Sequence, residues 1–175
     1  MNVDFTNVKI PKGRVQPSWC GPAALWNAFD SLGVNTTQEA LAQAMGTTEE
    51  HGTSHEGMLT GCKTLGLSGR WVSMEGVADP FGVLEEEVKK GNAVILDWMS
   101  GGDALNDGHY SGFLGRIGEG SQKAIVISDP EWIGSIKAMR EEDFMKVWFD
   151  TEGMKEVTKR FDKYALIIQK PIIPT

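Results

Sequence analysis

The hydrophobic pattern of this 175-residue chain changes from a helical period in the first half to a strand period in the second half. The first half carries helix-start residues followed by apolar residues at three- and four-residue spacing. The second half carries β-branched and aromatic runs bounded by glycine-rich turns, a pattern typical of neighbouring antiparallel strands. The sequence therefore predicts an α+β fold, with an N-terminal helical half packed on a C-terminal antiparallel sheet.

Capping residues, prolines and glycines along the chain predict where these elements begin and end. Proline in a first turn, capping boxes of Thr with Glu three residues later, and glycine after the last turn mark four helices. The predicted helices run from Cys20–Pro22 to Gly33, from Thr36 to Gly46, from Thr53 to Gly66 and from Asp79 to Gly91. The predicted strands cover residues 92–99, 109–117, 123–129 and 164–169, with a short helix over residues 140–149.

The length and composition indicate a single domain over residues 1–175, because no repeat, linker or low-complexity segment divides the chain. A net charge of −7 with dispersed lysines argues against a nucleic-acid partner. The apolar runs are too short to cross a membrane, and two cysteines are too few for a disulfide scaffold. We therefore expect an unexported, cytoplasmic protein. No pattern predicts a metal site or an organic cofactor, and the oligomeric state is left open.

Cys20 is the first candidate for chemistry, because small residues follow it at a predicted helix start. The backbone N–H groups and the positive end of a helix dipole stabilise a thiolate in such a place. Cys62 falls inside a predicted helix, where a cysteine is usually a small buried apolar residue. The sequence therefore favours Cys20 as the nucleophile.

A reactive thiolate needs a base, and the chain has three histidines. His51 and His55 stand among glutamates in a loop, where solvated surface histidines are common. His109 follows Gly108 at the start of a predicted strand, with small residues that allow close approach of another element. His109 is therefore the predicted base.

Two further residues complete the candidate site. Asp129 ends the strand after that of His109, and in an antiparallel pair the start of one strand faces the end of the next. Asp129 is therefore predicted to orient His109, although an Asp-Pro dipeptide is also an ordinary strand-ending turn. Gln16 is the only glutamine before Cys20, so its amide is the candidate partner of the Cys20 N–H in an oxyanion hole.

Several segments together resemble a known family. They are Gln16–Leu25, Leu32–Val34, Gly52–Gly57, Gly108–Tyr110, Ser128–Pro130 and Glu142–Phe144 with Trp148. In this order they are similar to the papain-like cysteine peptidases related to the bacteriocin-processing, double-glycine leader peptidases. The resemblance spans most of the chain, and the absence of a transporter region indicates a free-standing relative.

The resemblance implies a papain-like fold and a cysteine peptidase acting on a peptide or protein substrate. It implies a triad of Cys20, His109 and Asp129 with Gln16 in the oxyanion hole. One departure is that the family's glutamine usually stands six residues before the cysteine, whereas Gln16 stands four before Cys20. Trp19 and Trp132 neighbour the predicted triad and are weaker candidates for a substrate groove.

Two alternatives to hydrolysis stay open at the level of the sequence. The same groove would hold a peptide without cutting it if the site were catalytically silent, and the position of Gln16 favours that hypothesis. The same cysteine would act as an acyl or peptidyl transferase if an amine or thiol, instead of water, received the acyl group.

Overall fold

A computed structural model describes residues 9–101, 108–131, 135–152 and 159–169, and within them the chain forms five α-helices, one 3-10 turn and eight strands. The helices are α1 (Cys20–Ser31), α2 (Gln38–Met45), α3 (His55–Thr64), α4 (Pro80–Lys89) and α5 (Glu141–Val147). The strands are β1 (Ser68–Ser73), β2 (Ala93–Met99), β3 (Gly108–Ile117), β4 (Ala124–Ser128), β5 (Ile136–Arg140), β6 (Phe149–Glu152), β7 (Lys159–Asp162) and β8 (Tyr164–Gln169).

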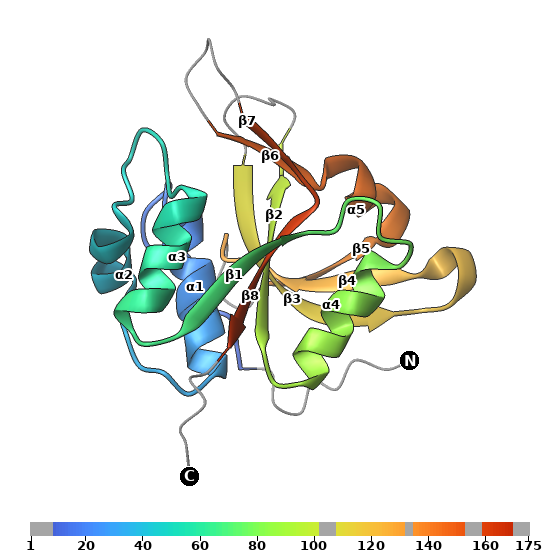
Figure 1. Cartoon of the computed structure of the whole chain (residues 1–175), viewed down its shortest axis with the longest axis horizontal. Coiled ribbons are helices and arrows are strands. Elements are labelled where there is room, and N and C mark those ends of the chain that lie inside the picture. The colour runs from blue at the N-terminus through green and yellow to red at the C-terminus, as the bar shows by residue number, and fades with distance from the viewer. Residues whose placement is uncertain (1–8, 102–107, 132–134, 153–158, 170–175) are drawn as a thin grey trace.

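Six of the strands form one antiparallel sheet in the order β1-β8-β2-β3-β4-β5, and β6 and β7 form a separate two-stranded ribbon. Helices α1, α2 and α3 gather at one end of the molecule, beside the sheet and away from α4 and α5 (Figure 1). This arrangement confirms the predicted α+β fold with a helical N-terminal half and an antiparallel C-terminal sheet.

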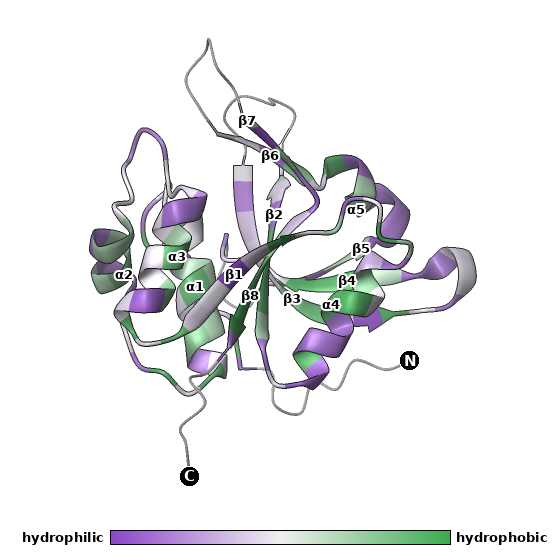
Figure 2. Ribbon diagram, in the orientation of Figure 1, coloured by the Kyte–Doolittle hydropathy of each residue, from purple (hydrophilic) through white to green (hydrophobic). Residues whose placement is uncertain are grey.

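Alternate residues of the sheet face two separate cores. Ile95, Leu166 and Ile168 pack with α1, α2 and α3, whereas Val94 and Leu96 pack with α4 and α5. The period of two along each strand produces this division, because successive side chains point to opposite faces of a sheet. In Figure 2 the central part of the sheet is largely hydrophobic, while the helices carry both hydrophobic and hydrophilic residues.

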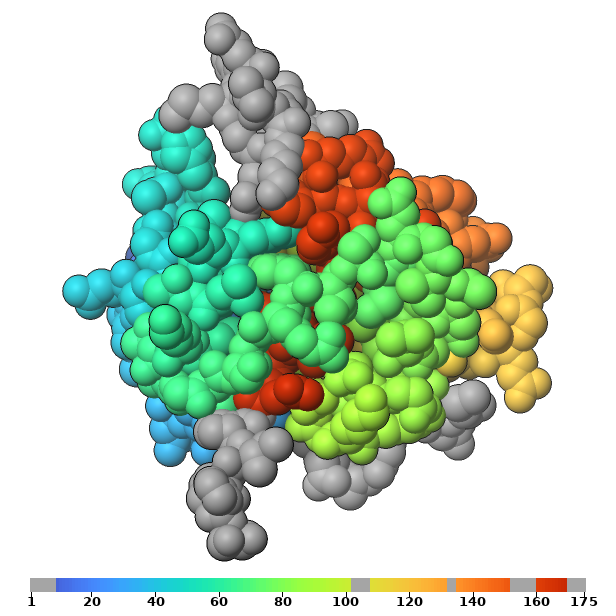
Figure 3. Space-filling model, viewed as in Figure 1, coloured from blue at the N-terminus to red at the C-terminus, as the bar shows by residue number. Residues whose placement is uncertain are grey.

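The space-filling view shows one face of the molecule, on which β8 lies partly covered between the α3–β1 segment and α4 (Figure 3). The longest helix that the structure describes has 12 residues, well short of the roughly 20 that span a bilayer. Within the described ranges no helix is both long and apolar enough to cross a membrane.

The helix starts differ from the prediction at two caps. Thr37 caps α2 and Ser54 caps α3, each accepting a hydrogen bond from a backbone N–H three residues later. The predicted caps, Thr36 and Thr53, are each one residue early. A run of two hydroxyl residues offers two possible caps, and the register of the helix selects between them. The prediction that Asp79 caps α4 with Pro80 at its first position is confirmed.

Four strands were not expected from the sequence. β1 pairs with β8, and the partners Ser68 and Gln169 lie about a hundred positions apart in the chain. β5 is an exposed edge strand on β4, and β6 and β7 pair only with each other. Each of these strands has four to six residues, so hydrophobic periodicity has little length over which to act.

Candidate active site

Cys20 is the first residue of α1 and is 9% exposed. The N–H groups of the first helical turn have no partner within the helix, and the capping residue Trp19 provides no side-chain hydrogen bond. These N–H groups and the helix dipole favour a negative charge beside them. The start of α1 is therefore a suitable environment for a thiolate.

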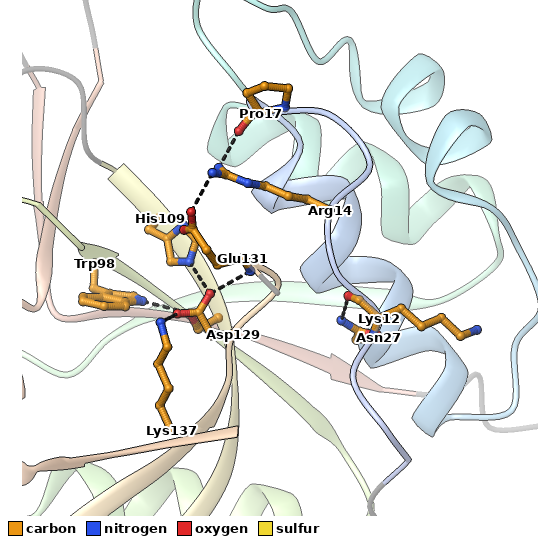
Figure 4. Close-up of polar contacts among 10 residues, drawn as sticks. Lys12, Arg14, Pro17, Asn27, Trp98, His109, Asp129, Glu131 and Lys137 are labelled. Carbon is orange, nitrogen blue, oxygen red and sulfur yellow. Dashed lines mark hydrogen bonds and ion pairs between the residues drawn. The ribbon is translucent and has the colours of Figure 1, made fainter. Parts of the chain in front are cut away.

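His109 and Asp129 form a buried pair beside this helix. His109 is the second residue of β3, which packs against α1, and Asp129 follows the last residue of β4. The Nε2 atom of His109 lies 2.8 Å from Oδ1 of Asp129, and the two residues are 3% and 2% exposed. Figure 4 shows the two side chains pointing toward each other. With Nε2–H donated to the carboxylate, Nδ1 is the ring nitrogen that remains for Cys20.

Asp129 is held as a carboxylate by three donors. Lys137 of β5 reaches Oδ2 at 2.6 Å, and the backbone N–H of Glu131 donates to Oδ1 at 2.9 Å. Burial acts to raise the pKa of Asp129, but the hydrogen bonds from His109 and Lys137 outweigh it and hold that pKa well below its usual range. Asp129 therefore carries a negative charge at all physiological pH values.

The environment of His109 favours the charged imidazolium. Burial acts to lower the pKa of His109, but hydrogen bonds to Asp129 and Cys20 and the charges of both groups raise it to about 9. The ring of Trp98 stands edge-on to the imidazole at 5.6 Å between centroids, and its indole N–H donates to the Ser111 hydroxyl at 3.1 Å. The imidazole is thus both charged and restrained in orientation.

The segment that leads into α1 is fastened to the loop after Asp129. The Arg14 N–H donates to the Pro130 carbonyl at 2.6 Å, and the Arg14 guanidinium pairs with Glu131 at 2.8 Å and also donates to the Pro17 carbonyl (Figure 4). Arg14, and not a glutamine, stands six residues before Cys20. These contacts hold the segment before Cys20 against the loop that follows Asp129.

Gln16 lies in that lead-in segment and is exposed. Its backbone carbonyl accepts a hydrogen bond from the Trp19 N–H at 3.1 Å. Its side chain lines a small surface pocket together with Arg14, Val15, Pro17 and Glu131. The structure therefore places Gln16 on the exposed surface of the lead-in segment, where that segment meets Glu131 of the loop that follows Asp129.

The two predicted groove tryptophans differ in what the structure shows. Trp19 is half-buried and directly precedes Cys20 as the capping residue of α1. Trp132 lies outside the described residues. Cys62 is fully buried in α3, and burial raises the pKa of its thiol to about 12. The expectation that Cys62 is a buried apolar residue is confirmed.

Among the residues that the structure describes, two groups of side chains bring potential metal-ligand atoms within 4.8 Å of one another. One group is His109, Asp129 and Glu131, whose first two members are already paired in the candidate site. The other is His55, Asp97 and Asp150, all buried. The expectation that His55 is a solvated surface residue is wrong, because its ring pairs with Asp97 and stacks on Trp71 at 4.1 Å between centroids.

The sequence patterns did not reveal the residues that support the pair. Lys137 lies in β5, whose five residues, Ile-Lys-Ala-Met-Arg, are too few and too irregular in hydropathy to mark an edge strand. Arg14 and Trp98 act through contacts with residues distant in the sequence, and no local pattern marks such contacts. Only the tertiary fold brings these groups to the site.

The close packing of Gly21 against Thr53 fixes the start of α1 and therefore the position of Cys20. A Cβ atom at position 21 would lie 2.7 Å from Oγ1 and 2.8 Å from Cβ of Thr53, closer than real side chains approach. We expect Gly21→Ala to lower the free energy of unfolding by about 1–3 kcal/mol, because the helix start must shift away from Thr53. Urea unfolding of Gly21→Ala, Thr53→Gly and the double variant measures this effect. Fully additive losses would show that the contact with Thr53 is not the cause.

Comparison with known proteins gives a consistent family assignment. The family model for the Peptidase_C39 like family matches residues 4–156. A protein of Methanothermobacter thermautotrophicus is 30% identical over 122 residues, which are 70% of this chain and 71% of that protein. A protein of Methanothermobacter marburgensis is 41% identical over 56 residues, covering 32% of this chain and 39% of its own.

Solved structures show the same fold at low identity. The peptidase domain of Streptococcus ComA, a bi-functional ABC transporter involved in a quorum-sensing pathway, superposes with a TM-score of 0.67 at 19% identity over 93% of this chain and 98% of its own. A C39-like peptidase structure from Bacillus anthracis gives 0.67 at 14% identity, over 97% and 98%. A double-glycine motif protease from an AMS/PCAT transporter, solved with the leader peptide, gives 0.61 at 18% identity over 93% of each chain. The sequence match and the shared fold together show that this chain belongs to the Peptidase_C39 like family.

Proposed function

We propose that this protein is a cysteine peptidase that hydrolyses a peptide bond through Cys20, His109 and Asp129. The observation that supports the proposal most strongly is the buried His109–Asp129 pair, whose charge is stabilised beside a cysteine at the start of α1. Family membership adds support, because the fold is that of C39 peptidase domains. The free thiols that this chemistry needs fit a reducing compartment such as the cytoplasm.

The proposed reaction begins with Cys20 as a thiolate and His109 as an imidazolium. The sulfur attacks the peptide carbonyl carbon, and the carbonyl oxygen becomes an oxyanion that the Cys20 N–H and the Gln16 amide stabilise. The C–N bond then breaks as His109 protonates the leaving amine, which leaves a thioester on Cys20. His109 next removes a proton from water, and the resulting hydroxide releases the acid and regenerates the thiolate.

A peptide or protein is the substrate class that the comparisons favour. The double-glycine motif protease, whose fold this chain shares, was solved in complex with the leader peptide. The net charge of −7 also disfavours a nucleic-acid substrate. We therefore propose that an extended peptide lies across the start of α1, next to the lead-in segment that carries Gln16.

Incubation with a diverse peptide library, followed by mass spectrometry of the products, tests this function. We expect new peptide termini whose formation requires Cys20, with water as the acceptor. An added amine that captures the acyl group in preference to water would indicate a transferase instead. Peptides retained by the folded protein without cleavage would indicate a silent binding module, which the position of Gln16 four residues before Cys20 favours.

A further inference from the structure

A second buried polar cluster lies outside the candidate catalytic pair. It consists of His55 at the first position of α3, Asp97 on β2 and Asp150 on β6. These residues are 7%, 1% and 7% exposed, and the Nε2 atom of His55 contacts Oδ2 of Asp97 directly. The cluster therefore joins the helical half to both the large sheet and the two-stranded ribbon.

The cluster brings two buried carboxyl groups together, because one oxygen each of Asp97 and Asp150 and a ring nitrogen of His55 all lie within 4.8 Å of one another. Burial and the charge of Asp97 raise the pKa of Asp150 to about 7, although the Thr151 N–H and the charge of His55 act in the opposite direction. Among the described residues these are the groups that act on Asp150. A protonated Asp150 can donate to Asp97, which in turn accepts from His55. Two ionised carboxylates in the same place would repel each other.

One end of the cluster supports the strand that carries His109. A Cβ atom at position 108 would collide with Oδ1 of Asp150 and lie 3.1 Å from its Cγ, so the Gly108 backbone rests directly on this carboxyl group. Gly108 is the residue before His109 at the start of β3. A change in the position of Asp150 therefore acts on the backbone that places the imidazole.

The other end supports the helix that carries Cys20. His55 lies two residues after Thr53. The backbone carbonyl of Thr53 accepts a hydrogen bond from the Tyr110 hydroxyl at 3.0 Å. Tyr110 lies opposite Asp97 in the β2–β3 register. The side chain of Thr53 packs against Gly21, the residue after Cys20. The cluster thus contacts the supports of both residues of the proposed thiol–imidazole pair.

We propose that His55, Asp97 and Asp150 form a positioning network that sets the approach of His109 to Cys20. The network depends on a hydrogen bond between the two carboxyl groups, which needs a proton on Asp150. Loss of that proton removes the donor from Asp150 and leaves two negative charges side by side. The backbone then moves away, and the imidazole with it. This inference rests on the proposed function, because it concerns the geometry of the same Cys20–His109 pair.

Asp150→Asn provides the test, because an amide keeps a donor at this position at every pH. The rate of Cys20 alkylation by iodoacetamide is measured at about pH 6 and about pH 8, on either side of the titration of Asp150, in a Cys62→Ala background. We expect equal rates with and without Asp150→Asn at the lower pH. At the higher pH we expect the Asp150→Asn protein to react about threefold faster or more, since only the native cluster has lost its proton.

Asp162→Asn is the matched control, because Asp162 lies on the partner strand β7 and pairs with the exposed Arg160. It should leave the rates unchanged at both pH values. If Asp150→Asn does not fold, Asp150→Ser keeps a hydroxyl donor and replaces it in the same assay. If the alkylation rate of the Asp150→Asn protein, divided by that of the protein with native Asp150, is the same at both pH values, the positioning network is wrong. Alkylation that is indifferent to His109→Ala would instead contradict the proposed function itself.

Discussion

Replacement of Cys20 by alanine is expected to reduce peptide hydrolysis by about 10⁴-fold or more, because no other group can form the thioester. Cys20 is the residue at the start of α1 that lies beside the His109–Asp129 pair. Removal of its sulfur leaves the imidazole and the carboxylate in place but takes away the nucleophile. The measurement is the rate of cleavage of a peptide that the native enzyme cuts, with near-UV circular dichroism to verify the fold.

Cys62→Ala is the control for this prediction. Cys62 is the other cysteine of the chain, is fully buried, and has a thiol pKa raised to about 12 by burial. Its replacement removes one buried atom, at a cost of about 1 kcal/mol in stability, and should preserve hydrolysis. Hydrolysis that survives in Cys20→Ala would exclude Cys20 as the nucleophile, whereas its loss in a folded Cys62→Ala protein would show that the buried thiol is also required.

Replacement of Asp129 by asparagine is expected to lower hydrolysis by about 10²–10⁴-fold, because a neutral amide no longer holds the charged imidazole in its orientation. Burial acts to lower the pKa of His109, but the Asp129 carboxylate, through its hydrogen bond to Nε2 and its charge, acts with Cys20 to raise that pKa to about 9. Loss of that charge moves the pKa of His109 down toward its ordinary value. The imidazolium that protonates the leaving amine is then lost at lower pH, so hydrolysis should decline at lower pH than in the native enzyme.

An NMR titration of the His109 ring protons measures this change independently of any substrate. Asp143→Asn is the matched control, because Asp143 is an α5 carboxylate that pairs with Lys146 and Arg140 on the surface. It should leave both the titration of His109 and the rate of hydrolysis unchanged. A native pKa for His109 in the Asp129→Asn protein would show that Asp129 does not act through the imidazole.

Local sequence signals accounted for the elements that carry the candidate site. The apolar residues after Cys20-Gly-Pro predicted a helix that begins at Cys20–Pro22, and the run after Gly108 bounded by glycine-rich turns predicted β3. The proximity of His109 and Asp129 then followed from antiparallel geometry alone. Each of these inferences needed only a short segment and the connection to the next.

Tertiary contacts explain what the sequence did not reveal. His55 stands among glutamates in the sequence, yet it is buried because α3 packs against β1, where its ring stacks on Trp71 and contacts Asp97. Lys137 reaches Asp129 from an edge strand of five residues, and β1 depends on a partner at the far end of the chain. Such contacts depend on the packing of distant segments, which no local period encodes.

The relatives define how far the likeness extends. The solved structures share between 14% and 19% of their residues with this chain, so they show a common fold and leave the reaction of this protein to be tested. Arg14 stands six residues before Cys20, where the resemblance led us to expect a glutamine. Its ion pair with Glu131 connects the lead-in segment to the loop after Asp129.

The most direct test of the account is the pH dependence of Cys20 alkylation by iodoacetamide in a Cys62→Ala background, with and without His109→Ala. The account predicts rapid reaction well below the free-thiol pKa of about 8.5, and loss of that low-pH reaction when His109 is replaced. This result would establish an activated Cys20–His109 pair. A profile like that of free cysteine, unchanged by His109→Ala, would contradict the proposal that this protein is an active cysteine peptidase.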